Sequence, residues 1–133
     1  MNSIINPLSL VKPIGYAHAI EATNGRTLYL AGQVAFDEQG KIVHAGDIVR
    51  QFDRALANLQ IVMSAANGEM SDIVKLLIFV TDKNSYAAHL KEIGKVYRTY
   101  FGKYFPAMTL VGVASLFEDD ALIEIEGIAV IQD

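Results

Sequence analysis

The chain has 133 residues, a formal net charge of −4 and no cysteine. This length is that of a single domain, so residues 1–133 are treated as one domain. The missing cysteines exclude disulfides, thiolate nucleophiles and cysteine-bound metals, and the singly scattered lysines and arginines do not form the basic stripe of a nucleic-acid binder.

The chain is more apolar than a domain of its size can easily bury. Its mean hydropathy is +0.28 and only 20% of its residues are charged. The longest apolar run, Leu76 to Val80, is far too short to span a membrane, and the first ten residues do not resemble a signal peptide. We therefore expect a soluble, cytoplasmic protein with no membrane or nucleic-acid partner. The surplus of apolar surface predicts an interface, and hence a homo-oligomer.

The first part of the chain predicts strands. Residues Ala17–Ala22 and Thr27–Phe36 have strand-like composition and are joined through Asn24-Gly25, a strong hairpin signal. A second turn then leads into a short strand at Ile42-Val43.

The middle of the chain predicts two helices around one strand. Asp47 is a cap for a helix whose apolar residues recur at helical spacing until Asn67-Gly68 stops it. The segment Ile73–Thr81 is almost continuously apolar, which is typical of a central strand covered on both faces. The second helix is predicted from about Ser85 to Phe101, with Gly102 ending it.

Two further strands, Ala107–Ser115 and Ala121–Ile131, complete the order β-β-(β)-α-β-α-β-β. This order lacks the strict alternation of a doubly wound sheet. It predicts an α+β fold in which a mixed six-stranded sheet carries two helices on one face. Because alternation puts apolar side chains on both faces of several strands, we expect the other face to pack against further copies of the chain.

Two carboxylates lie on one face of the last strand. Alternation points Glu124 and Glu126 the same way as Leu122 and Ile128. Carboxylates on an apolar face are costly unless they are hydrogen-bonded or reach water. Either this face meets solvent near the middle of the strand, or one carboxylate lines a cleft and activates or orients water. The residues alone leave both interpretations open.

Other candidate residues are equally ambiguous. Gly32-Gln33 interrupts an apolar strand, where a glycine indicates a β-bulge, a close backbone approach to a ligand, or plain packing. Tyr16 could present its phenol to a cleft or plug the end of the sheet. His18, His44 and His89 are isolated in sequence, so no metal site is predicted, and no phosphate loop, nucleophile elbow or metalloprotease motif is present.

Several segments together resemble those of one known family. The segments, each with the family's pattern, are residues 15–19 (P-Y-S-Q-A), 30–34 (V-S-G-Q-I), 72–82 (D-V-V-K-T and F-V-T-D), 105–107 (the start of F-P-A-R-S) and 123–129 (V-E-I-E-A-I-A). They occur in the same order and at similar spacing over almost the whole chain. On these segments the chain resembles the Rid family, also called YjgF-like proteins.

The resemblance implies a chorismate-mutase-like α+β fold and a homotrimer with a ligand cleft at each subunit interface. It implies hydrolysis of reactive enamines and imines to a ketoacid and ammonia, without a cofactor or a metal. It gives Glu124 and Tyr16 the catalytic roles. The ligand-binding positions that it implies are Ala31, Gly32, Gln33, Met108, Thr109 and Leu110.

The sequence departs from the family's deaminases at four positions, three of them among the ligand-binding positions just named. Met108 stands where those deaminases have an arginine that binds the substrate carboxylate. A thioether cannot replace the planar, bidentate hydrogen-bond donor that a guanidinium provides. The other three departures, which replace a serine, a cysteine and an asparagine, are Ala31, Leu110 and Gly94. From sequence, neither Arg98 nor Arg26 is an obvious substitute for the missing arginine.

Three functions follow as hypotheses. The first is a hydrolase for an enamine, an imine or a related small metabolite lacking a carboxylate, in which Glu124 positions the water and Tyr16 bonds the polar end of the substrate. The second is a trimer that binds a metabolite without turnover. The third, a ribonuclease or translation inhibitor, ranks well behind because the acidic charge balance disfavours direct RNA binding.

Overall fold

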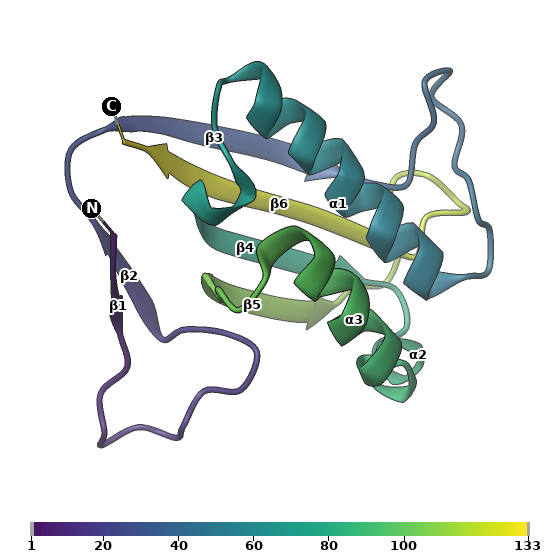
Figure 1. The fold of residues 1–133 in the computed structure, drawn as a ribbon. Helices are drawn as coiled ribbons and strands as arrows, with labels where there is room; N and C mark the ends of the chain where they lie inside the picture. Colours follow the sequence, from purple (N-terminus) through teal and green to yellow (C-terminus); the bar gives the residue numbers. More distant parts are fainter. Residues whose placement is uncertain (1, 133) are drawn as a thin grey trace.

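The fold places two long helices against one face of a four-stranded sheet (Figure 1). A computed structural model of the chain describes residues 2–132. The elements in chain order are β1 (Asn2–Ile5), β2 (Ala19–Ala22), β3 (Arg26–Gln33), α1 (Ile48–Ala65), a 3-10 turn (Met70–Asp72), β4 (Ile73–Val80), α2 (Lys83–Ala88), α3 (Leu90–Phe101), β5 (Ala107–Gly112) and β6 (Ile123–Ile131).

The predicted α+β class is confirmed, but the strands divide into two sheets instead of one. The main sheet has the order β3-β6-β4-β5, in which β4 and β5 are parallel and the other neighbours antiparallel. β1 and β2 form a separate antiparallel pair. The chain comes alongside the free edge of β5 at Ala17, which bridges Ala107 and donates its amide proton to the Pro106 carbonyl at 3.0 Å.

The turn at Asn24-Gly25 forms, but the predicted hairpin around it is wrong. Asn24 and Gly25 have φ angles of 60° and 84°, which are the left-handed values of a tight turn. The strands on either side nevertheless pair elsewhere, β2 with β1 and β3 with β6. A long apolar partner strand at the C-terminal end outcompetes the local pairing. Of the predicted Ile42-Val43 strand, only a bridge to Phe36 is present.

The first predicted helix is confirmed and the second is divided. Asp47 caps α1, its carboxylate accepting from the Arg50 amide at 3.1 Å. The predicted helix from Ser85 to Phe101 breaks at His89, where the backbone leaves the helical region with φ −116°. His89 Nδ1 lies 2.7 Å from the Ser85 carbonyl oxygen, so the side chain satisfies a group that a continuous helix would have used.

The core lies between the helices and the sheet. Phe52, Leu56 and Leu59 of α1 are fully buried against Ile78 of β4 and Ile123 of β6. Gln51 is the polar exception: its side-chain amide donates to the Asp120 carbonyl at 2.9 Å, and its oxygen accepts from the Leu122 amide at 2.8 Å. Because a buried amide is tolerated only when bonded, Gln51 holds the start of β6 in place.

The opposite face of the main sheet has no cover within the residues described. Pairing across the strands puts Phe79, Val111 and Glu124 in one row of this face, and Leu77 with Glu126 in the next. Their side chains are half-buried or exposed. We call this surface the open face. β4 is therefore central, as predicted, but within one chain it is covered on one face only.

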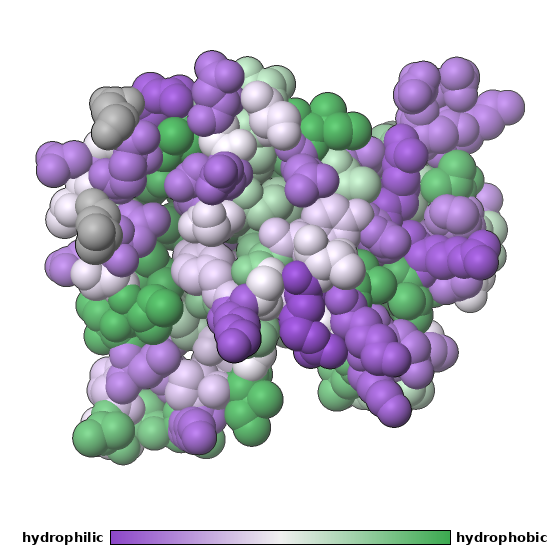
Figure 2. All heavy atoms as spheres, in the orientation of Figure 1, coloured by the Kyte–Doolittle hydropathy of each residue, from purple (hydrophilic) through white to green (hydrophobic). Residues whose placement is uncertain are grey.

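A second apolar surface belongs to the segment that joins β1 to β2. Figure 2 shows apolar side chains gathered where Figure 1 draws this segment, below and beside the sheet. Its large exposed apolar residues are Leu8, Leu10, Val11 and Ile14, and Ile4 and Ile5 at the end of β1 precede them. No helix among residues 2–132 is long and apolar enough to cross a membrane.

Candidate functional site

A cleft opens at the edge of the main sheet, between β5 and the two C-terminal helices. It consists of two adjoining hollows, an inner one of about 340 Å³ and an outer one of about 360 Å³. Both hollows are lined by Ile14, Gly15, Tyr86, Leu90 and Met108, so they are continuous. We call this the edge cleft. Its size is at the lower end of the range for small-molecule sites, and its walls are mainly apolar, as such sites usually are.

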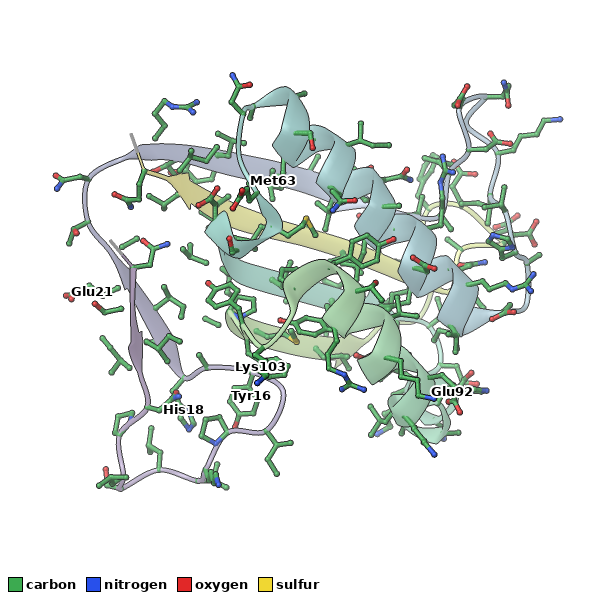
Figure 3. All side chains as sticks on the ribbon, viewed as in Figure 1. Tyr16, His18, Glu21, Met63, Glu92 and Lys103 are labelled. Atoms are coloured by element: carbon green, nitrogen blue, oxygen red, sulfur yellow. The ribbon has the colours of Figure 1, made fainter. Side chains whose placement is uncertain are left out.

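Tyr16 reaches the edge cleft because the backbone bridge at Ala17 holds its segment against β5. Its ring lines the outer hollow together with Met108 and Leu110. The loop that carries Tyr16 is tied further by His18, whose Nε2 lies 2.7 Å from the Val11 carbonyl oxygen. Figure 3 shows Tyr16 beside Lys103, and the two line a third hollow, which shares Ile14 and Gly15 with the edge cleft.

Strand alternation divides the predicted ligand residues of β5. Met108 pairs with Leu76 and Leu110 with Ile78, and both of these partners are buried beneath the helices. Met108 and Leu110 therefore face the edge cleft. Thr109 points to the open face, where its hydroxyl accepts from Lys75 Nζ at 2.9 Å. Two of these three residues line the cleft and the third does not.

Glu124 lies on the open face and packs against Gly32. An ideal Cβ built on Gly32 would stand only 2.0 Å from Glu124 Oε2, so the carboxylate occupies the place of a side chain at position 32. The approach depends on a bulge in β3 between Leu30 and Gln33, which breaks the register with β6. The sequence left a bulge, an approach to a ligand and plain packing open at Gly32; the bulge is present, and within one chain the group that packs against Gly32 is Glu124.

The remaining predicted residues of β3 lie near this carboxylate without a strong contact to it. Ala31 is exposed, and the Gln33 amide donates only a long 3.5 Å bond to the Ala31 carbonyl. Within the part of the chain described, the carboxylates of Glu124 and Glu126 accept no hydrogen bond. Both oxygens of Glu124 are thus available to water or to a ligand.

The two groups of predicted residues do not meet within one chain. Met108 and Leu110 are on the helix side of the edge strand β5, whereas Glu124 is on the opposite face of β6. β4 lies between those strands, which puts their backbones roughly 10 Å apart at the usual strand spacing. Met108 and Leu110 therefore do not flank Glu124 within a single subunit.

Two polar side chains of the edge cleft were not selected from the sequence. Burial raises the pKa of Tyr86 to about 12, so its phenol stays neutral and can donate a hydrogen bond. Arg98 lines the inner hollow with Gly94 and Met108, although the sequence suggested no link between these residues. Among residues 2–132, neither the Tyr86 hydroxyl nor the Arg98 guanidinium has a hydrogen-bond or ion-pair partner. The i, i+4 spacing of Gly94 and Arg98 was the sequence signal that could have identified Arg98 as a residue of the cleft.

Tyr97 of α3 has a structural role. Its hydroxyl donates to the Tyr104 carbonyl at 2.6 Å, and its ring stacks on Phe105 at a centroid distance of 5.0 Å. Burial raises its pKa. The ring forms a wall of the inner hollow, while the hydroxyl is already used.

No cluster of three or more His, Asp or Glu residues able to hold a metal occurs among residues 2–132. The site is therefore built from one carboxylate on the open face, one cleft tyrosine from the N-terminal segment, and an apolar edge cleft that contains an arginine. These features define a small α+β protein whose surface hollows suit small organic ligands.

The family is established by comparison with known proteins. A family model described as Endoribonuclease L-PSP matches residues 9–131. A RutC family protein from Pyrococcus horikoshii is 36% identical over 97% of this chain and 98% of its own length. A 2-iminobutanoate/2-iminopropanoate deaminase from Dermatophagoides farinae is 36% identical, with 91% and 90% covered. A solved Rid-family protein of unknown function from Yersinia pestis has a TM-score of 0.87 at 35% identity, covering 98% of each chain. The chain belongs to the Rid (YjgF-like) family.

Proposed function

We propose that the protein is a cofactor-independent hydrolase of a small imine or enamine, acting as a homotrimer with one ligand cleft at each subunit interface. The observation that carries this proposal is the separation of the site into two halves. The edge cleft contains Tyr16 and apolar walls, and the open face presents Glu124 with unused oxygens. Each half lacks what the other contains.

A second copy of the chain brings the halves together. The open face has half-buried or exposed apolar side chains, among them Tyr29 at 81% exposure, which need a cover. When the open face of one subunit packs against the edge cleft of the next, the contact is head-to-tail and closes into a ring. Glu124 of one subunit then faces Tyr16 of its neighbour. The choice of three subunits follows from the family resemblance.

The reaction needs only a positioned water and proton transfers. Water adds to the carbon of the C=N bond and forms a carbinolamine, while Glu124 takes a proton from that water. Starting from the protonated imine, this addition gives a neutral carbinolamine. The proton on Glu124 then passes to the carbinolamine nitrogen, the carboxylate takes the remaining hydroxyl proton as the C–N bond breaks, and ammonia leaves a carbonyl product. An enamine is first protonated on carbon to give the imine. Tyr16 donates a hydrogen bond to the polar end of the substrate throughout.

The substrate differs from that of the relatives named 2-iminobutanoate/2-iminopropanoate deaminase. Their substrates carry a carboxylate directly on the reacting carbon. At the position where the resemblance implies an arginine for that carboxylate, this chain has Met108 in the edge cleft. A charge-assisted contact of about 1.5–3 kcal/mol is lost there, so short 2-iminoacids are poor substrates.

Two measurements test the proposal. Light scattering at micromolar concentration is expected to give three times the 14.5 kDa chain mass, and a monomer would refute the shared cleft. Imines generated in solution by an amine oxidase are expected to release ammonia faster with the protein than without it. Binding of an amine or ketone product without any such acceleration would instead establish a non-catalytic binding protein.

A further inference from the structure

We propose that Arg98 is the anion-binding residue of the edge cleft, and that the substrate carries its carboxylate beyond an apolar spacer, away from the reacting carbon. This inference rests on the proposed function for the reaction, but the anion site itself does not depend on turnover.

Gly94 makes room for Arg98 in the cleft. Side chains on a helix tilt toward its N-terminus, so residue 98 lies over the turn that contains residue 94. An ideal Cβ on Gly94 would be 3.3 Å from the nearer terminal nitrogen of Arg98, and both residues line the inner hollow. The guanidinium therefore rests on bare helix backbone. A larger residue at position 94 would displace it from this place.

The charge of Arg98 is not used by the protein. Its guanidinium has no hydrogen-bond or ion-pair partner among residues 2–132. No aspartate or glutamate lines either hollow of the edge cleft. The nearby phenol of Tyr86, whose pKa burial raises to about 12, is neutral at physiological pH. A cation beside apolar walls, with a neutral donor close by, is suited to a carboxylate that has an apolar body.

The position of Met108 sets where that carboxylate lies in the substrate. Arg98 lines only the inner hollow and Tyr16 only the outer one, while Met108 lines both. A ligand that reaches Arg98 and Tyr16 together must therefore pass through the part of the cleft that both hollows share, where Met108 lies with Tyr86 and Leu90. In a 2-iminoacid the carboxylate is bonded directly to the reacting carbon, which leaves no atoms to fill the shared part of the cleft between the two ends. An imine with several methylene groups between C=N and carboxylate can fill it.

The first test measures binding without chemistry. Hexanoate and hexanamide have the same length and shape, and only hexanoate is charged. Hexanoate is expected to bind the wild-type protein more tightly than hexanamide. Arg98→Met is expected to raise the Kd of hexanoate by about 10- to 150-fold, the range for one charge-assisted contact, and to leave hexanamide unchanged.

Matched variants separate a specific site from a general charge effect. Lys103→Met removes the same charge next to Tyr16 but outside the edge cleft, and it is expected to leave hexanoate binding unchanged. Gly94→Leu is expected to weaken hexanoate binding with Arg98 still present. Because Arg98 is exposed, melting temperatures of Arg98→Met and wild type are expected to agree. Equal binding of hexanoate by wild type and Arg98→Met, or weakening by Lys103→Met alone, would overturn the inference.

A second test connects the anion site to turnover. An amine oxidase makes one imine from 5-aminopentanoate and another, without the carboxylate, from pentylamine. Wild type is expected to prefer the carboxylate-bearing imine by about 10-fold or more in kcat/KM, and Arg98→Met is expected to remove this preference. Turnover of both imines without a preference would overturn the Arg98 assignment and leave the hydrolase intact. Hexanoate binding lost in Arg98→Met, with neither imine hydrolysed, would support the anion site and refute the hydrolase.

Discussion

Replacing Gly32 by alanine tests the role of Glu124 without altering the carboxylate itself. The added Cβ would stand 2.0 Å from Glu124 Oε2 and 2.8 Å from its Cδ. Ordinary contact begins near 3.4 Å, so the carboxylate must move by about 1.4 Å. A displacement of about 1 Å in a positioned group can cost roughly 100-fold in rate. We expect Gly32→Ala to lower imine hydrolysis by about that factor.

Stability is expected to change little in the same variant. Gly32 does not have a left-handed backbone conformation, so alanine is allowed there. Alanine also reduces the freedom of the unfolded chain, which stabilises the fold by about 0.4–1 kcal/mol. The cost of moving the end of a flexible, half-exposed glutamate is of similar size. The two effects nearly cancel, and the melting temperature is expected to stay within about 4 °C of wild type.

Two other glycines of the main sheet serve as controls. A Cβ on Gly112 of β5 would meet only atoms at 3.9 Å, so Gly112→Ala is expected to change neither rate nor melting temperature. A Cβ on Gly127 of β6 would be 2.4 Å from the Lys75 backbone oxygen. Because backbone cannot rotate away, Gly127→Ala is expected to destabilise the protein by about 1–3 kcal/mol.

The assay pairs thermal melting with ammonia release from an imine made in solution. The reasoning requires a loss of rate in Gly32→Ala with the melting temperature preserved. A fall in melting temperature as large as that of Gly127→Ala would show that Gly32 is a packing residue. An unchanged rate with an unchanged melting temperature would show that the position of Glu124 has no catalytic importance.

Three further predictions concern the carboxylates, the cleft methionine and the buried phenols. Glu124→Gln is expected to abolish imine hydrolysis, whereas Glu126→Gln, on the same open face, leaves it nearly unchanged; the reverse pattern in a rate assay would refute the assignment. Hydrolysis of 2-aminoacrylate, followed by coupled ketoacid detection, is expected to be feeble in wild type and to rise in Met108→Arg. A fast wild-type rate would mean that another side chain binds the substrate carboxylate. The pKa values of Tyr86 and Tyr104 are raised by burial to about 12, above the value near 10 of an unfolded chain. Their contribution to stability is therefore complete below pH 10 and is lost as the pH rises toward 12. Melting temperatures measured from pH 8 to 12 are expected to fall only above pH 10. The fall is expected to be less steep in Tyr86→Phe than in wild type.

The sequence was sufficient for features that depend on neighbours along the chain. Helix α1 and its Asp47 cap follow from 3.6-residue periodicity and a local hydrogen bond. The left-handed turn at Asn24-Gly25 follows from the conformational freedom of its two residues. Local energies decide each of these features.

Only the tertiary structure could decide which strands pair and what meets across them. β3 pairs with β6, nearly a hundred residues away in sequence, because side-chain packing along a long apolar strand outweighs the local hairpin signal. Alternation then separates Met108 from Glu124 on opposite faces, a result that depends on the strand order β6-β4-β5 and not on either segment alone. The meeting of Arg98 and Met108 was likewise invisible in the sequence, since it requires α3 to pack over β5 with Gly94 facing the cleft. The residue types of the site can be found from the sequence, but their grouping depends on non-local packing, which no spacing along the chain records.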